Sequence, residues 1–185
     1  RLIDILADSS ESTGQPINYW LTVDLSEISQ ASYLTQVDDQ LVSGTFTLKG
    51  EGQLAFFSLP TMEAMKTAIR RKDNIQTIVT ASHKTPNKIQ GIASYGQYLL
   101  ASRSFGPYTS ELVVLDRQSP QRILQRIKFP PYLEQIVVVG NQLAVLFESG
   151  AAVYREKAHP VLPHVLLLDL ETLLHKKRRK NSRTA

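Results

Sequence analysis

The sequence predicts an all-β fold, a propeller-like array of antiparallel blades in which about three blades are recognisable. Two observations lead to this prediction. Short apolar segments alternate with turns that contain Gly, Asn or Pro, and a unit of three such segments recurs along the chain. The prediction also includes a short inserted helix and a C-terminal helix or tail that is basic.

The clearest unit spans Ile89 to Asp116, IQGIASYGQYLLASRSFGPYTSELVVLD. Its strands are predicted to be separated by turns at Gly96 and at Gly106-Pro107, because Gly accepts a positive φ and Pro cannot donate to a β-ladder. Turns at this short spacing are typical of a meander.

Two further copies follow from the same pattern. One begins at Leu133, turns at Gly140-Asn141 and closes in VLLLD over residues 165–169, as the first unit closes in LVVLD. A weaker copy runs from Tyr33 to Leu59. Aligning Leu41, Leu99 and Leu143 gives spacings of 58 and 44 residues. Blade repeats run about 40 to 50 residues, so the longer spacing requires an insertion.

The insertion is predicted to be a surface helix over residues 60–71, whose apolar face packs against the sheets. Strands are predicted at residues 18–25 and 75–80, and residues 1–6 are either an edge strand or a helix. Residues 83–88 are predicted to form a polar loop. Residues 122–129 alternate apolar and basic side chains, which predicts an outer, half-exposed strand, and residues 171–180 are predicted to extend as a helix.

Several short segments resemble a group of bacterial, mostly exported β-propeller proteins of unassigned function. The resemblance covers about residues 33–170 and rests on Gln90-Gly91-Ile92, Ser102 to Gly106, Ser110-Glu111-Leu112, and Leu146 to Ala151 with Tyr154. It implies about six blades and a funnel at their axis as the binding face, but no reaction.

The chain is short for a closed ring, which needs about four to eight blades. Three explanations stay open: the terminal segments supply further strands, the chain is part of a larger protein, or self-association completes the ring. We expect a propeller-like domain over residues 1–175 and a disordered basic tail over residues 176–185.

The basic charge is concentrated in that tail. Residues 176–185 carry six Lys or Arg and no acid, so residues 1–175 hold 15 basic against 17 acidic residues. The tail, Lys176, Lys177, Arg178, Arg179 and Lys180, is a candidate for binding nucleic acid or anionic lipid, whereas the body shows no nucleic-acid pattern. The chain has no Cys and no segment predicted to span a membrane.

Four polar residues are candidates for ligand binding at a propeller axis: Gln90, Arg103, Glu134 and Glu148. Carboxylate and amide oxygens suit Ca²⁺, which makes Glu134, Glu148 and Asn87 a candidate metal site. The structural alternative is that Glu148 and Arg103 form an ion pair that caps turns. His159 and His164 flank prolines and do not have the spacing of a zinc-protease helix.

We therefore expect a non-enzymatic binding or interaction module that engages a protein partner or a second copy, with a small molecule as another candidate ligand. No cofactor is required by this function. The alternatives are a calcium-dependent hydrolase of lactonase or phosphoesterase type with its site at the axis, and a fragment that completes a propeller with another chain. We expect the protein in the cell envelope or outside the cell, with the cytoplasm as the alternative.

Overall fold

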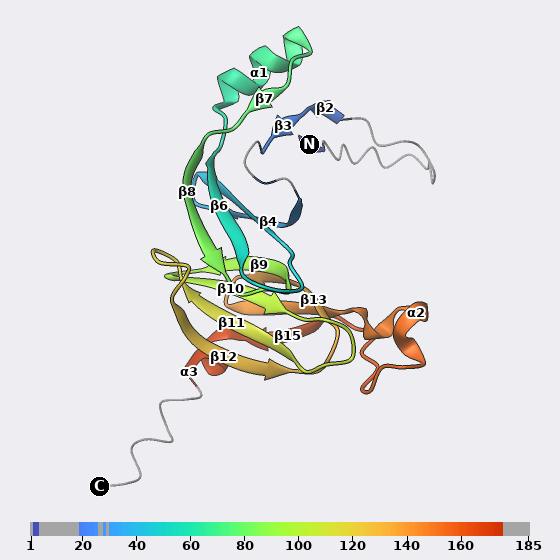
Figure 1. Cartoon of the computed structure of the whole chain (residues 1–185). Coiled ribbons are helices and arrows are strands. Elements are labelled where there is room, and N and C mark those ends of the chain that lie inside the picture. The colour runs from blue at the N-terminus through green and yellow to red at the C-terminus, as the bar shows by residue number, and fades with distance from the viewer. Residues whose placement is uncertain (1, 4–18, 26–27, 29, 176–185) are drawn as a thin grey trace, which may run out of the picture.

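The computed structural model describes residues 2–3, 19–25, 28 and 30–175, and is built mainly from three antiparallel sheets that follow one another along the chain (Figure 1). The first sheet consists of β4 (Ala31–Val37), β5 (Gln40–Thr45), β6 (Gly52–Ser58) and β8 (Val79–Thr85). The second consists of β9 (Ile89–Tyr95), β10 (Tyr98–Arg103), β11 (Ser110–Asp116) and β12 (Ile123–Phe129). The third consists of β13 (Leu133–Val139), β14 (Gln142–Phe147) and β15 (Leu166–Asp169). The predicted antiparallel β-architecture is confirmed.

The first sheet is interrupted between its third and fourth strands by α1 (Met62–Arg71) and β7 (Ile75–Gln76). The helix begins where the Thr61 side chain accepts a hydrogen bond from the Ala64 amide at 3.2 Å, and it ends at Lys72, whose φ is 58°. β7 pairs in parallel with β3 (Val23–Asp24), and β1 (Leu2–Ile3) pairs with β2 (Tyr19–Leu21).

Two predictions in this region are confirmed only in part. The polar loop predicted over residues 83–88 begins later than expected, because β8 runs to Thr85 and residues 86–88 alone lie between β8 and β9. The helix α1 does not pack on the three antiparallel sheets. It projects from one end of the molecule (Figure 1), its Met62 is 65% exposed, and Ala68 and Met65 pack instead against Val23 and Ile75.

The same backbone hydrogen bond recurs in all three sheets. The residue immediately after the third strand donates its amide to a carbonyl of the first turn: Leu59 to Asp39 at 3.2 Å, Arg117 to Gln97 at 3.0 Å, and Leu170 to Asn141 at 2.9 Å. These bonds place Leu41, Leu99 and Leu143 at equivalent positions of β5, β10 and β14. Positions in the three sheets can therefore be compared directly.

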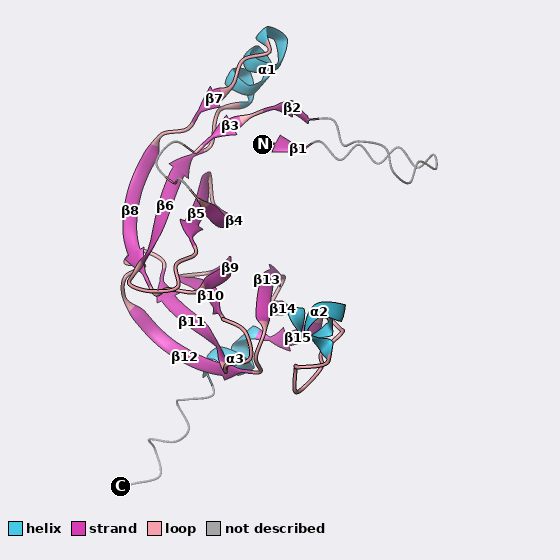
Figure 2. Cartoon of the chain, turned by 45° about the vertical axis from the view of Figure 1, so that its right-hand side comes forward, coloured by secondary structure: helices cyan, strands magenta, loops and turns pink. Residues whose placement is uncertain are grey.

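Each sheet packs face to face on the next. The core between the first and second sheets contains Val42, Leu54, Ile92 and Leu99, and the core between the second and third contains Leu100, Leu112, Ile136 and Leu143. The first strands of the sheets, β4, β9 and β13, lie side by side (Figure 2). Within the described ranges no strand joins the first sheet to the third, so the array is open.

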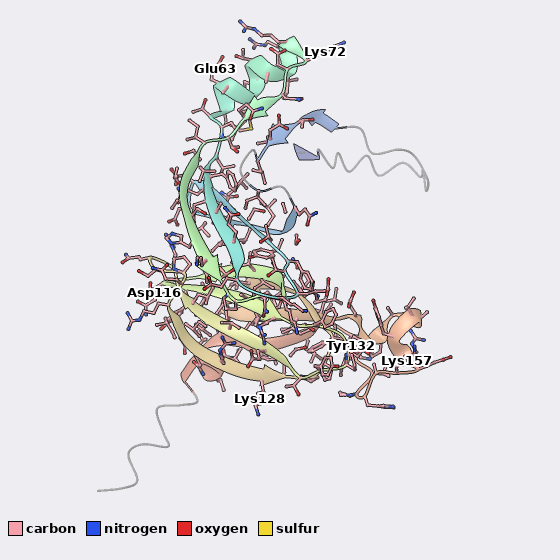
Figure 3. The ribbon with its side chains drawn as sticks, in the orientation of Figure 1. Glu63, Lys72, Asp116, Lys128, Tyr132 and Lys157 are labelled. Atoms are coloured by element: carbon pink, nitrogen blue, oxygen red, sulfur yellow. The ribbon has the colours of Figure 1, made fainter. Side chains whose placement is uncertain are left out.

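The third sheet differs from the others after β14. The chain forms η1 (Glu148–Gly150) and α2 (Ala152–Arg155) before it returns as β15, and then enters α3 (Leu170–His175). In Figure 3, Asp116 marks the end of the sheets near the β9–β10 turn, and Tyr132 and Lys157 mark the opposite end beside α2. The predicted C-terminal helix is confirmed as far as His175, and the basic tail lies outside the described residues.

Candidate functional site

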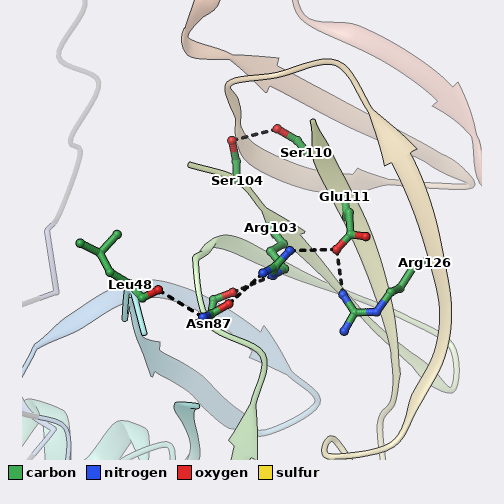
Figure 4. Close-up of polar contacts among 7 residues, drawn as sticks. All are labelled: Leu48, Asn87, Arg103, Ser104, Ser110, Glu111 and Arg126. Carbon is green, nitrogen blue, oxygen red and sulfur yellow. Dashed lines mark hydrogen bonds and ion pairs between the residues drawn. The ribbon is translucent and has the colours of Figure 1, made fainter. Parts of the chain in front are cut away.

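The predicted site residue Arg103 lies in a polar network between the first and second sheets (Figure 4). Its guanidinium donates to the Glu111 carboxylate at 3.1 Å and to the Asn87 side-chain oxygen at 2.9 Å. Arg126 donates to the same carboxylate at 2.8 Å, and the Asn87 amide nitrogen donates to the Leu48 carbonyl at 3.2 Å. The network joins the β5–β6 loop to three strands of the second sheet.

This geometry corrects the predicted structural ion pair. Arg103 pairs with Glu111, its direct cross-strand neighbour on β11, and not with Glu148. Directly opposed side chains on neighbouring antiparallel strands are within contact distance, so the register alone favours this partner. Glu111 sits between two guanidinium groups, which makes the network a structural connection.

Glu134 and Glu148 lie together at the end of the third sheet near α2. The Glu148 amide donates to the Tyr132 carbonyl at 2.9 Å, which brings the start of β13 beside the end of β14. Burial, together with the negative charge of Glu148, raises the pKa of Glu134 to about 7. This proximity of two carboxyl groups is the part of the predicted site that the structure brings together.

The other predicted residues are held elsewhere. The Gln90 side chain donates to the Ser104 carbonyl at 3.4 Å, and Asn87 belongs to the Arg103 network. Among the described residues, no hydrogen bond or ion pair joins Asn87, Gln90 or Arg103 to the Glu134–Glu148 pair. Within the same part of the chain, no group of three or more His, Asp or Glu side chains is arranged to hold a metal ion. The tail residues Lys176 to Lys180 lie outside the description.

Sequence reasoning missed an exposed apolar surface, the outer face of the third sheet. We call this surface the open face. Val137 on β13 is 52% exposed and Leu167 on β15 is 59% exposed, with Ala144 of β14 between them in the same cross-strand row. The open face is completed by Val139, Leu146 and Val165, all exposed.

The corresponding face of the second sheet is buried. By the shared register, Ala93, Leu112 and Val114 occupy the positions of Val137, Val165 and Leu167. They are at most 4% exposed because the third sheet covers them. The matching sequences at the ends of β11 and β15, LVVLD and VLLLD, show that these positions are equivalent. The sequence alone does not show which of the two sheets is covered by a neighbouring sheet.

Buried polar contacts also join the covered face of the second sheet to the third sheet. The Ser102 hydroxyl donates to the Glu134 carbonyl at 2.7 Å, and the Leu133 amide donates to the Ser110 hydroxyl at 3.2 Å. Gly91 lies at the same junction, where a Cβ would meet the Gln135 side-chain oxygen at 2.5 Å. Leu146 is the equivalent of Ser102 on the open face, and it is exposed.

Comparison with known proteins identifies no family. No protein-family model matches the chain, and no curated protein matches it at a significant level. A chain in the crystal structure of a nidogen–laminin complex is 11% identical with a TM-score of 0.47, and the match covers 79% of this chain and 45% of that one.

Two computationally designed proteins show weaker likeness. Ika8 is 11% identical with a TM-score of 0.37, over 83% of this chain and 49% of that chain. Ika4 is 12% identical with a TM-score of 0.35, over 85% of this chain and 99% of that chain. The chain thus spans about half the length of the first two structures, and no argument rests on these likenesses. None of the helices in the described ranges is long and apolar enough to cross a bilayer.

Proposed function

We propose that the protein is a non-enzymatic interaction module with a propeller-like arrangement of its three sheets. Its open face binds the apolar face of a β-sheet in a partner protein, in the way that the second sheet binds the third. The observation that carries the proposal is the exposure of Val137, Val165 and Leu167 at positions where the second sheet is fully covered. Exposed apolar patches of this kind are typical of protein interaction sites.

The propeller-like arrangement is supported by the order of the strands. Each sheet is a meander whose first strand lies innermost, and β4, β9 and β13 are neighbours (Figure 2). Radial repetition of such sheets is the propeller architecture, in which every blade except an end blade is covered on both faces. The third sheet is an end blade in this arrangement.

The opposite end of the array favours a partner protein over head-to-tail stacking of copies. The outer face of the first sheet carries Ala55 and Phe57, which are buried under Leu25 and Ile28. A second copy could not offer this face to Val137 and Leu167 without displacing its own covering segment. The partner therefore has to supply an uncovered apolar sheet face of its own.

The test combines light scattering and crosslinking on protein purified natively from the cells that produce it. We expect a mass above that of one chain, which falls to the mass of one chain in the Val137→Lys/Leu167→Lys double variant and persists in Val153→Lys. Val153 is a matched control because it is 78% exposed on α2, away from the open face. The same mass for all three proteins would overturn the proposal.

A photo-crosslinking residue in place of Leu167 then identifies the contact. A crosslinked peptide from another protein, with the alternating apolar and polar residues of a β-strand, supports the proposal. A crosslinked peptide that is uniformly polar contradicts it. Crosslinking of Leu167 to the same strand of a second copy also contradicts a partner protein and assigns the open face to a symmetric dimer.

The calcium-dependent hydrolase is retained as a second candidate because Glu134 and Glu148 lie together. Two carboxylates would supply part of the six to eight oxygen ligands that Ca²⁺ takes, and backbone carbonyls or water would supply the rest. Calorimetric titration with Ca²⁺ tests this candidate. Binding that is lost in Glu134→Gln would support it, and no heat of binding at millimolar Ca²⁺ would eliminate it.

A further inference from the structure

Two cavities lie on either side of the second sheet, at the end of the sheets that carries the β9–β10 turn. A cavity of about 490 Å³ lies between the second sheet and α3, and one of about 400 Å³ lies between the first and second sheets. Gln97 and Gln118 line both cavities, so the two are neighbours. Asp116, which also lines the larger cavity, marks this end of the molecule in Figure 3.

The two cavities occupy equivalent places in successive layers. Gln40 and Phe56 line the cavity between the first and second sheets, and their equivalents by register, Tyr98 and Val114, line the cavity beside α3. The next layer bounds each cavity, through the β9–β10 turn in one case and through Leu174 of α3 in the other. The repeat thus creates two related sites about 10 Å apart, the usual distance between stacked sheets.

The charged side chains that line the cavities are already paired. Arg117 forms an ion pair with Asp38, and Arg122 lies 3.7 Å from the Asp116 carboxylate. An ionic ligand would lose hydration here without gaining a free counter-charge. The lining therefore favours an uncharged ligand.

Glutamine side chains supply the hydrogen-bonding groups of both sites. Within the described part of the chain, the side chains of Gln118 and Gln125 make no hydrogen bond. Gln40 donates to the Thr80 hydroxyl at 2.6 Å and Gln97 donates to the Tyr98 hydroxyl at 2.9 Å, and the side-chain oxygens of both remain available. A side-chain amide both donates and accepts, as a sugar hydroxyl does.

Apolar surface lies beside these amides. Tyr98, Leu124 and Leu174 line the cavity beside α3, and Phe56 lines the other cavity. A pyranose ring carries hydroxyl groups at its rim and C–H groups on its faces, so it can use amides and an aromatic or aliphatic surface together. A peptide fits less well, because an extended peptide is held through main-chain groups of a strand edge and these sites offer side-chain amides.

We propose that the two cavities bind an uncharged oligosaccharide, with sugar units in both cavities and the chain crossing Gln97 and Gln118 between them. Two equivalent sites in successive layers suit a ligand that is itself built from repeated units. No residue of the open face lines either cavity. The inference therefore goes beyond the proposed function and does not depend on it.

The probes are neutral tetrasaccharides of α-linked glucose, β-linked glucose, xylose, mannose and N-acetylglucosamine, each titrated into isotope-labelled protein. At least one should shift the amide resonance of Gly96, which lines the smaller cavity, and leave that of Gly106 in the β10–β11 loop unmoved. No shift at Gly96 with any probe at millimolar concentration would overturn the proposal. A shift caused by acetyl-tetraalanine amide but by no sugar would assign the cavities to a peptide and would also overturn it.

Substitution of the glutamines then locates the sugar. Gln118→Ala removes an exposed amide that lines both cavities, and it should weaken the tetrasaccharide about tenfold through the lost hydrogen bond. Gln142→Ala is the matched control, because Gln142 is the exposed equivalent of Gln40 in the third sheet and lines neither cavity. Equal affinities of the two variants would contradict the proposal.

The length of the ligand tests whether the cavities act together. The monosaccharide of the best probe fills one cavity, so it should bind about tenfold or more weakly than the tetrasaccharide. Gln40→Ala and Gln125→Ala each alter one cavity, and each should weaken the tetrasaccharide without abolishing its binding. Equal affinity for the monosaccharide and the tetrasaccharide would contradict a site that spans both cavities.

Discussion

The second and third sheets carry apolar residues at the same positions, but these residues have opposite environments. Leu112 and Val114 of β11 lie under the third sheet, whereas Val165 and Leu167, their equivalents at β15, face solvent. The difference does not arise from composition, since both strands are equally apolar. It arises from the presence of a neighbouring sheet, and it identifies the third sheet as an uncovered end of the described array.

The largest difference between the two sheets is expected when equivalent side chains are truncated. Leu112→Ala should lower the free energy of unfolding by about 3 kcal/mol, because it leaves a cavity between two packed sheets. Val165→Ala should change it by less than about 0.5 kcal/mol, because the side chain is already exposed. Denaturant titration of both variants measures the difference, and equal losses would mean that the third sheet is covered in solution.

A smaller effect is expected at the buried polar contact between the same sheets. Ser102→Ala removes the hydroxyl that donates to the Glu134 carbonyl and leaves that carbonyl unsatisfied, at a cost of about 1–2 kcal/mol. Leu146→Ala, at the equivalent position of the open face, should cost well under 1 kcal/mol. If thermal melting ranked the two variants in the reverse order, the assigned equivalence would be wrong.

The contribution of Glu134 to the stability of the third sheet is expected to depend on pH. Its raised pKa means that the folded protein keeps a proton that the unfolded chain has lost, so its contribution to stability declines as pH rises from about 4.5 to about 7. Glu134→Gln should therefore be more stable than the wild type by about 1 kcal/mol above pH 7, after allowance for solvent screening. At pH 4 the two proteins should unfold alike.

Urea titrations at pH 4, 6 and 8 measure this prediction. A constant difference between wild type and Glu134→Gln across the three pH values would contradict the assigned proton linkage. Glu111→Gln is a control at a carboxylate that lies between Arg103 and Arg126. It should be destabilised at pH 8, in the opposite direction to Glu134→Gln.

The smallest effect is expected at the open face itself. Leu167→Lys should change the stability of the isolated chain by no more than about 0.5 kcal/mol, because the long side chain can remain in water. The same variant should nevertheless prevent partner binding. Calorimetry of the purified monomer checks the first statement, and a loss of several kcal/mol would show that Leu167 is packed within the chain.

The sequence was sufficient to predict the antiparallel strands, the turn at Gly96, the inserted helix and the alignment of Leu41, Leu99 and Leu143. It was insufficient for the end of β8, because exposed Lys84 on this outer strand resembles a loop residue, and the sequence does not show that His83 packs against Phe56. β-propensity and the alternation of apolar and polar residues are properties of a single strand and carry no information about its neighbours. Both are weaker in a strand at the edge of a sheet, so such a strand is harder to predict.

The candidate site was harder to predict than the fold. Glu134, within β13, and Glu148, directly after β14, are near each other because these two strands pair in the third sheet. The partner of Arg103 depended on the register of β10 with β11, which fixes Glu111 opposite to it. The open face could not be predicted, because exposure of Val137 and Leu167 depends on which sheets are present and not on the residues themselves.

The stacked arrangement of the sheets has a consequence for how the molecule unfolds. When each layer touches only its immediate neighbours, stability spreads along the stack by nearest-neighbour coupling, and the end layers open first. The second sheet, held on both faces, should show the slowest amide exchange, and the third should exchange by local opening. A bound partner would turn the third sheet into an internal layer, and its amides would then exchange as slowly as those of the second.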